Sequence, residues 1–131
     1  MTANTNRNTV SLLLGTRSGS FQPQIIFPVG SALIDIAVGD FNGDSSLDII
    51  TSNNNDNSVS VLLGTGSGSF QPQATFSVGS GPFAVEVGDF NGDDNLDIVV
   101  TNNGGNSVSV LLRTRSGSFQ PQATFPVGPG L

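Results

Sequence analysis

The feature that most constrains the fold of this chain is an internal repeat of 49 residues. Residues 31–79 and 80–128 align without a gap, and residues 8–30 match the second half of the same unit. The strings Val59-Ser60-Val61-Leu62-Leu63 and Val108-Ser109-Val110-Leu111-Leu112 show the correspondence. A repeat of this length indicates an array of similar units, each of which buries its apolar face against its neighbours.

Each unit contains four short segments with the alternation and β-branched content of strands. In the first unit they are Leu33 to Gly39, Leu47 to Ser52, Ser58 to Leu63 and Gln71 to Val78; in the second they are Phe83 to Gly88, Leu96 to Thr101, Ser107 to Leu112 and Gln120 to Val127. Four antiparallel strands in a unit of roughly 40 to 50 residues are typical of a β-propeller blade.

The predicted fold is therefore all-β, with propeller blades of four antiparallel strands and two and a half blades per chain. Residues 1–30 are the N-terminal half-blade, formed by strands three and four of the unit, and residues 31–79 and 80–131 are whole blades. Because a closed propeller needs at least about four blades, we expect two or three copies of the chain to complete one ring as a homo-oligomer. The alternative is that the sequence is an excised or engineered piece of a longer array.

Phenylalanine recurs with the same period. Eight of the nine Phe residues occupy equivalent positions, and these are Phe21/Phe70/Phe119, Phe27/Phe76/Phe125 and Phe41/Phe90. Rings that recur at a structural period normally pack in a core, so we expect them between blades rather than in a ligand site.

A nine-residue string, D-F-N-G-D-x-x-L-D, stands between the first and second strands of each unit. It places side-chain oxygens at positions 1, 3, 5 and 9 of a short loop, a spacing that allows the loop to surround one hard cation. The residues at these positions are Asp40, Asn42, Asp44 and Asp48 in the first loop, and Asp89, Asn91, Asp93 and Asp97 in the second.

Charge is concentrated in the same two loops. Seven of the ten acidic residues lie inside them, and the only basic residues are four arginines. A metal-free pair of Asx-rich turns is the alternative interpretation. Three acids at one spacing in both units favour a metal, and a flexible oxygen cage favours Ca²⁺ over Mg²⁺. The formal charge would then change from −6 to −2, because two divalent cations add four charges.

These strings resemble the FG-GAP/VCBS repeat family, the calcium-loop blades of integrin α-subunit propellers and of many bacterial surface proteins. The resemblance implies a calcium ion in each loop, two per chain, with the backbone carbonyls of Ser46 and Asn95 as additional ligands. It also implies an extracellular or cell-surface location and a structural or adhesion role. The family often has glycine at loop position 6, where this chain has Ser45 and Asp94.

Composition excludes several other functions. The chain has no His, Cys, Lys, Tyr or Trp, so the usual general bases and activated nucleophiles are missing and we expect no enzyme activity. Few bases make nucleic acid an unsuitable partner. No apolar run is long enough to insert into a membrane, and no signal peptide is visible.

The partners that remain are other copies of the chain, and a glycan or protein ligand. A carbohydrate-binding, lectin-like propeller is the alternative function, but the chain lacks the Trp and Tyr on which sugars usually stack. Its candidate hydroxyl-binding residues are turn asparagines: Asn53, Asn54, Asn55, Asn102, Asn103 and Asn106. Arg17 and Arg115 stand at equivalent turn positions, where we expect solvated charges or, alternatively, contacts between subunits and the acidic loops.

Overall fold

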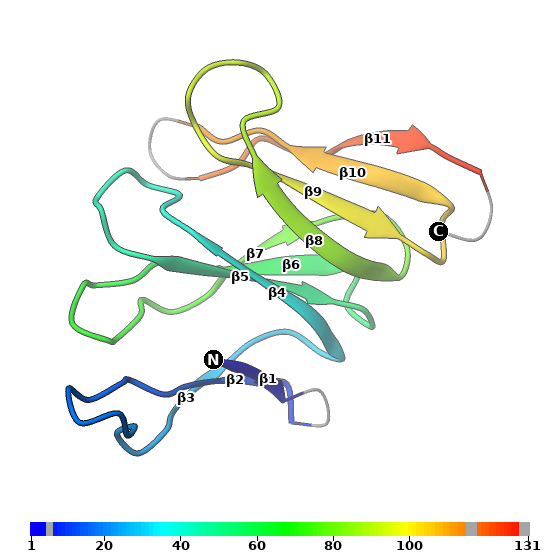
Figure 1. Cartoon of the computed structure of the whole chain (residues 1–131). Helices are drawn as coiled ribbons and strands as arrows, with labels where there is room; N and C mark the ends of the chain where they lie inside the picture. Colours follow the sequence, from blue (N-terminus) through cyan, green and yellow to red (C-terminus); the bar gives the residue numbers. More distant parts are fainter. Residues whose placement is uncertain (5–6, 115–117, 129–131) are drawn as a thin grey trace.

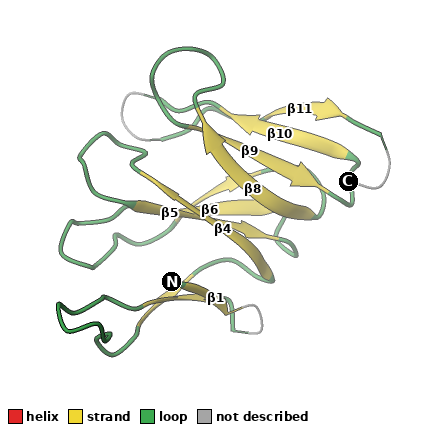
Figure 2. Cartoon of the chain, viewed as in Figure 1, coloured by secondary structure: helices red, strands yellow, loops and turns green. Residues whose placement is uncertain are grey.

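The computed structural model describes residues 1–4, 7–114 and 118–128, and every regular element in these ranges is a β-strand (Figure 2). The strands form three antiparallel sheets, which follow one another along the chain from the N-terminus to the C-terminus (Figure 1). The N-terminal sheet contains β1 (Thr2–Asn4), β2 (Thr9–Leu12) and β3 (Ile25–Pro28) in that order. The all-β prediction is confirmed.

The other two sheets have four strands each, in chain order. The middle sheet contains β4 (Leu33–Gly39), β5 (Asp48–Asn53), β6 (Ser58–Leu62) and β7 (Ala74–Ser77). The C-terminal sheet contains β8 (Pro82–Gly88), β9 (Asp97–Asn102), β10 (Ser107–Leu111) and β11 (Ala123–Pro126). Each of the eight strands overlaps a predicted one. The edge strands β7 and β11 begin later than expected, after Pro72 and Pro121, which have no N–H to donate to a neighbour.

The N-terminal sheet differs from its prediction. Two strands were expected there, but β1 pairs with β2 as a third strand, with Asn4 opposite Thr9. Asn53 stands opposite Ser58 in the same way in the middle sheet. The segment Thr2-Ala3-Asn4 therefore corresponds to Thr51-Ser52-Asn53, and the repeat extends without a gap to the first residues. The term half-blade was wrong for this sheet, because it also has the end of the second strand.

The sheets pack against one another through apolar side chains. We call the side of a sheet that is directed toward the next sheet in the sequence its forward face, and the opposite side its rear face. The forward face of the middle sheet contributes Phe41, Ile50, Val59, Val61 and Val78 to one core, and the rear face of the C-terminal sheet contributes Val85, Ile98, Val100, Leu111 and Phe119. A second core joins Val10 and Val29 of the N-terminal segment to Leu33, Ile49 and Leu62.

Five of the eight recurrent phenylalanine rings lie at these junctions, as the sequence predicts, whereas Phe21, Phe90 and Phe125 are more than half exposed. Phe119 forms edge contacts with Phe41 and Phe76, with ring centroids 6.3 and 5.4 Å apart. Phe27 and Phe70 form a similar pair at 4.9 Å across the preceding junction. Polar bonds also cross between sheets, since Val85 N donates to Asp35 Oδ2 at 3.1 Å. Each sheet is thus positioned by its neighbour, and the acidic loops are carried at the ends of the strands.

Candidate metal centre

The first acidic loop joins β4 to β5, and the carboxylate of Asp40 organises it from within. Oδ1 of Asp40 accepts hydrogen bonds from Gly43 N at 2.7 Å and from Asp44 N at 3.2 Å, and Oδ2 accepts one from Ser45 N at 2.9 Å. To direct three consecutive amides at one carboxylate the backbone turns into the left-handed region, with φ of 78° at Gly43 and 65° at Ser45. Glycine suits such a conformation, whereas serine is strained there.

Asp48 closes the loop from the other side. It is the first residue of β5 and is fully buried. Its Oδ2 accepts a hydrogen bond from Phe41 N at 2.7 Å, and its Oδ1 accepts one from Gly64 N at 2.8 Å. A single carboxylate therefore holds both the acidic loop and the turn that follows β6.

The second loop, between β8 and β9, repeats this arrangement. Asp89 accepts hydrogen bonds from Gly92 N, Asp93 N and Asp94 N at 2.8, 3.1 and 2.8 Å. Buried Asp97 accepts one from Phe90 N at 3.0 Å and one from Arg113 N at 2.9 Å. Asp94 has a φ of 63°, matching that of Ser45, so a sequence change at this position leaves the conformation unaltered.

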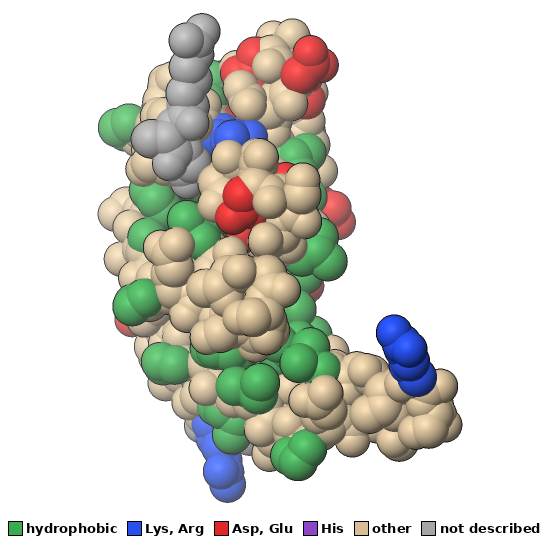
Figure 3. Space-filling view, turned by 90° about the vertical axis from the view of Figure 1, so that its left-hand side faces the viewer, with side chains coloured by type: hydrophobic (Ala, Val, Ile, Leu, Met, Phe, Trp, Pro, Cys, Tyr) green, Lys and Arg blue, Asp and Glu red, His purple; other side chains and the backbone are tan. Residues whose placement is uncertain are grey.

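The structure brings together the three predicted acidic ligands of the second loop, whereas no such cluster is found among the described residues for Asp40, Asp44 and Asp48 of the first loop. One carboxylate oxygen from each of Asp89, Asp93 and Asp97 lies within 4.8 Å of the other two. The two loops lie at the same end of their sheets, and acidic side chains gather there on the surface (Figures 1 and 3). Three carboxylates and an amide oxygen form an all-oxygen donor set, which suits a hard divalent cation such as Ca²⁺.

The residues at loop positions 3 and 7 also point their polar groups into the loop. Asn42 Nδ2 donates to Asp44 Oδ2 at 3.1 Å, and Asn91 Nδ2 donates to Asp93 Oδ2 at 3.2 Å. Ser46 N donates to Asp44 Oδ1 at 2.8 Å, and Asn95 N donates to Asp93 Oδ1 at 2.9 Å. The remaining lone pairs of these carboxylates are available to a cation.

Burial and hydrogen bonds in the loops shift the pKa values of three carboxyl groups. Burial raises the pKa of Asp48, the amides of Gly64 and Phe41 oppose this, and repulsion from Asp44 and Asp40 adds to the increase. Burial also raises the pKa of Asp40, but hydrogen bonds from several backbone amides outweigh this effect, so the pKa of Asp40 is lowered overall. The hydrogen bond from Asn95 N lowers the pKa of Asp93. Burial and, to a smaller extent, the neighbouring acids therefore oppose the ionised form of Asp48, and a nearby cation would favour that form.

Two of the turn asparagines that we considered for sugar binding serve the fold, whereas Asn55, Asn103 and Asn106 are exposed. Asn53 and Asn102 are fully buried. Asn53 Nδ2 donates to Ser58 Oγ at 3.1 Å and to Ser60 Oγ at 2.8 Å, and Asn102 repeats these bonds with Ser107 and Ser109 at the same distances. Sequence reasoning missed this buried polar ladder, although the recurrence of Asn with Ser-x-Ser at a fixed spacing could have indicated it.

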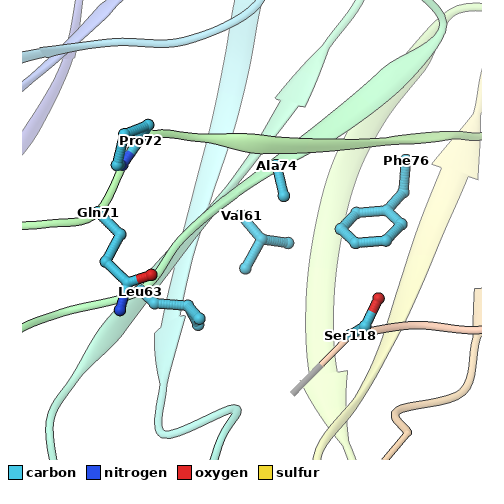
Figure 4. A pocket seen from close by; sticks show the side chains of 7 residues that line it. All are labelled: Val61, Leu63, Gln71, Pro72, Ala74, Phe76 and Ser118. Atoms are coloured by element: carbon cyan, nitrogen blue, oxygen red, sulfur yellow. The ribbon is translucent and has the colours of Figure 1, made fainter. Parts of the chain in front are cut away.

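Pockets in the described part of the chain are found between sheets. One groove of about 510 Å³ lies between the N-terminal and middle sheets and is lined by apolar residues that include Leu12, Leu14 and Phe70. Another, of about 200 Å³, lies at the next junction (Figure 4). Arg115 lies outside the described residues.

Comparison with models of known protein families shows to which family the chain belongs. Residues 1–51 and 40–100 each match the FG-GAP-like repeat. The chain belongs to the FG-GAP-like repeat family. This membership confirms the resemblance that the two acidic loops predicted, and the first match begins at residue 1, in agreement with the strand pairing of β1. No curated protein matches the chain.

A chain of the mutant Tc holotoxin pore from Photorhabdus luminescens resembles this FG-GAP-like protein in structure. The likeness covers 95% of this chain and 6% of the toxin chain, with a TM-score of 0.51 and 20% sequence identity. Similarity at this level shows a shared fold, and together with the family match it supports a β-propeller-type module. No described residue belongs to a helix capable of crossing a bilayer.

Proposed function

We propose that the chain is a calcium-binding β-propeller module of structural or adhesion type, which assembles with copies of itself and has no catalytic activity. The observation that carries the proposal is the meeting of Asp89, Asp93 and Asp97, with carboxylate oxygens within 4.8 Å of one another. Each loop would hold one Ca²⁺ through the side chains at positions 1, 3, 5 and 9 and the carbonyl at position 7, so two ions would bind per chain.

The energetic reason for a metal is the cost of the empty, ionised loop. Three like charges a few ångströms apart repel one another, and burial of Asp48 and Asp97 removes the water that would screen them. A divalent cation converts this repulsion into attraction. Because the loop is short and lacks a bidentate glutamate, we expect a dissociation constant on the order of 10⁻⁴ M or weaker, as in extracellular modules.

Native mass spectrometry of the chain with and without a chelator tests the proposal, because it reports bound ions and subunit number together. We expect two Ca²⁺ per chain, and one in a variant with Asp93→Ala. Mg²⁺ at the same concentration is the control for selectivity. A chain that carries no ion at millimolar calcium, with its fold intact by circular dichroism, would overturn the calcium assignment.

The adhesion role and an extracellular or cell-surface location rest on the family and on the shortage of catalytic residue types. A closed ring would give the bound loops a fixed orientation from which a protein or glycan ligand could be held. A glycan array distinguishes the structural role from the carbohydrate-binding alternative. Binding to defined glycans would favour the alternative, and the internal bonds of Asn53 and Asn102 argue against these two residues as the contacts.

A further inference from the structure

The two outer sheets expose apolar side chains whose counterparts inside the stack are covered. On the forward face of the C-terminal sheet, Phe90 is 51% exposed, while Phe41 at the same repeat position of the middle sheet is 0% exposed. On the rear face of the N-terminal sheet, Phe21 is 66% exposed, while its counterpart Phe119 is 6% exposed. Residues identical in type therefore differ only in whether a neighbouring sheet lies over them.

We propose that these two faces bind each other in different copies of the chain. The forward face of the C-terminal sheet of one copy packs on the rear face of the N-terminal sheet of a second copy. This inference rests on the self-assembly proposed above and specifies the surfaces, the partner and the direction of assembly.

The covered junction in the same chain is the template for this contact. Phe119 reaches from the C-terminal sheet to Phe41 and Phe76 of the middle sheet, with interplanar angles of 62° and 78°. Phe21 is the repeat counterpart of Phe119, and Phe90 and Phe125 are the counterparts of Phe41 and Phe76. Repeating the same step between copies brings Phe21 of one copy against Phe90 and Phe125 of the other.

The rest of the forward face supports the same pairing. Figure 4 shows Val61, Ala74 and Phe76 of the middle sheet lining one pocket together with Ser118, which lies in the turn between β10 and β11. Their counterparts Val110, Ala123 and Phe125 have no sheet over them among the described residues, and Phe125 is 52% exposed. On the opposite side, Leu13 is 36% exposed, whereas its counterparts Leu62 and Leu111 are 2% and 0% exposed.

Charge favours the same orientation. At the covered junction, the turn after β10 lies on the acidic loop of the middle sheet, and a methyl group placed on Gly43 would lie 3.6 Å from Nη2 of Arg113. The corresponding turn of the N-terminal sheet has Gly15 at the position of Arg113, and the exposed Arg17 stands two residues further along this turn. The proposed step brings this turn, with the positive charge of Arg17, toward the loop that contains Asp89, Asp93 and Asp97, and the opposite charges favour this approach.

A contact between two different surfaces is heterologous, so it joins copies head to tail and closes into a ring when the rotation per copy allows. The N-terminal sheet has no counterpart of β8 among its described strands. A contact formed by the described strands alone would lack the side chains that Val85 and Val87 supply at the covered junction, so we expect it to be weaker than that junction.

Sedimentation velocity over a wide concentration range tests the pairing with two variants, Phe21→Asp and Phe125→Asp. Both rings are more than half exposed, so each variant should fold and bind calcium as the wild type does. We expect the wild type to assemble and each variant alone to remain monomeric. An equimolar mixture should form a one-to-one dimer and nothing larger, because each variant retains one intact face. Phe83→Ser, at a ring that is 49% exposed beside the covered junction, is the matched control and should assemble normally.

The outcomes separate this inference from the proposed function. If the wild type assembles but the mixture stays monomeric, or if Phe83→Ser is as disruptive as the two variants, the pairing of faces is wrong while self-assembly stands. A wild type that stays monomeric at every concentration with calcium bound would overturn both the pairing and the self-assembly, and would leave calcium binding in place. If like faces paired instead, at least one of the two variants would still form dimers on its own, and mixing the variants would produce no new species.

Discussion

Replacing Gly79 by alanine tests how closely the sheets approach one another. Gly79 follows β7, and a Cβ at this position would lie 2.5 Å from Asn102 Nδ2 and 2.7 Å from Asn102 Cγ in the next sheet. Real Cβ atoms do not approach other atoms so closely, so the buried amide must move. Because Asn102 Nδ2 donates to Ser107 Oγ and Ser109 Oγ, moving it also breaks two buried hydrogen bonds.

The expected loss can be worked from these contacts. Overpacking of a well-filled interior costs about 1–3 kcal/mol. Each lost hydrogen bond removes about 0.5–1.5 kcal/mol of net stabilisation, and a donor left unpaired in the interior costs more. We therefore expect Gly79→Ala to lower the free energy of unfolding by roughly 2–6 kcal/mol. Urea denaturation should show a lower midpoint with an unchanged slope.

Two controls make the test specific to the contact. Gly128 stands at the same repeat position, and a Cβ there meets nothing within 4 Å, so Gly128→Ala should change stability by less than about 0.5 kcal/mol. In a chain that already carries Asn102→Ala, the amide that would clash with the new Cβ is absent. Gly79→Ala should then lower the free energy of unfolding by less than half as much as in the wild type. If its cost were the same in both backgrounds, the close approach to Asn102 would not be the reason for the glycine.

Three further predictions concern the loops and the buried ladder. Chelation should destabilise the chain, by about 2.7 kcal/mol per site when calcium had been present at 100 times its dissociation constant; thermal unfolding with EDTA should show the loss, and a double variant with Asp44→Ala and Asp93→Ala should no longer respond to calcium. Ser45→Gly should stabilise the first loop by about 0.5–1 kcal/mol, because glycine relieves the left-handed backbone, and a lower urea midpoint would contradict this. Val100→Thr should supply a hydroxyl to the buried Asn102 Oδ1, which lacks a partner, and raise stability by up to about 1 kcal/mol; a loss would show that the removed methyl group matters more.

The repeat made most of the fold predictable. The alternation of apolar residues located the strands of the middle and C-terminal sheets, because hairpin-connected strands with one period leave few other arrangements. The strand Thr2–Asn4 was missed because three residues, two of them polar, show no alternation on their own. Alignment of Thr2-Ala3-Asn4 with Thr51-Ser52-Asn53 at the repeat interval contains the missing information.

The donor residues of the site were also predictable, since the spacing of Asp, Asn, Asp and Asp is local. The sequence did not indicate that the aspartate at loop position 9 also holds the turn after the next hairpin. Asp48 accepts a hydrogen bond from Gly64 N, and Asp97 accepts one from Arg113 N, in each case from a residue 16 positions away. Such a hydrogen bond depends on how the following hairpin folds back. For the same reason, the equal sequence environments of Phe21 and Phe119 gave no indication that one is exposed and the other buried.

The long-range bonds of the buried aspartates place the proposed calcium loops within the packing between sheets. Asp97 fixes the turn after β10 through Arg113 N, and the side chain of that same arginine lies on the acidic loop of the preceding sheet, beside Gly43. Disorder in one loop would therefore loosen both its own hairpin and the junction to its neighbour. A cation that orders the loop therefore has an effect beyond the nine residues of the loop itself. It also sets the orientation in which the next sheet can pack. The residues of the proposed metal loop thus also determine how neighbouring sheets pack. We expect a unit that lost its acidic residues to pack less regularly against the sheets on both sides.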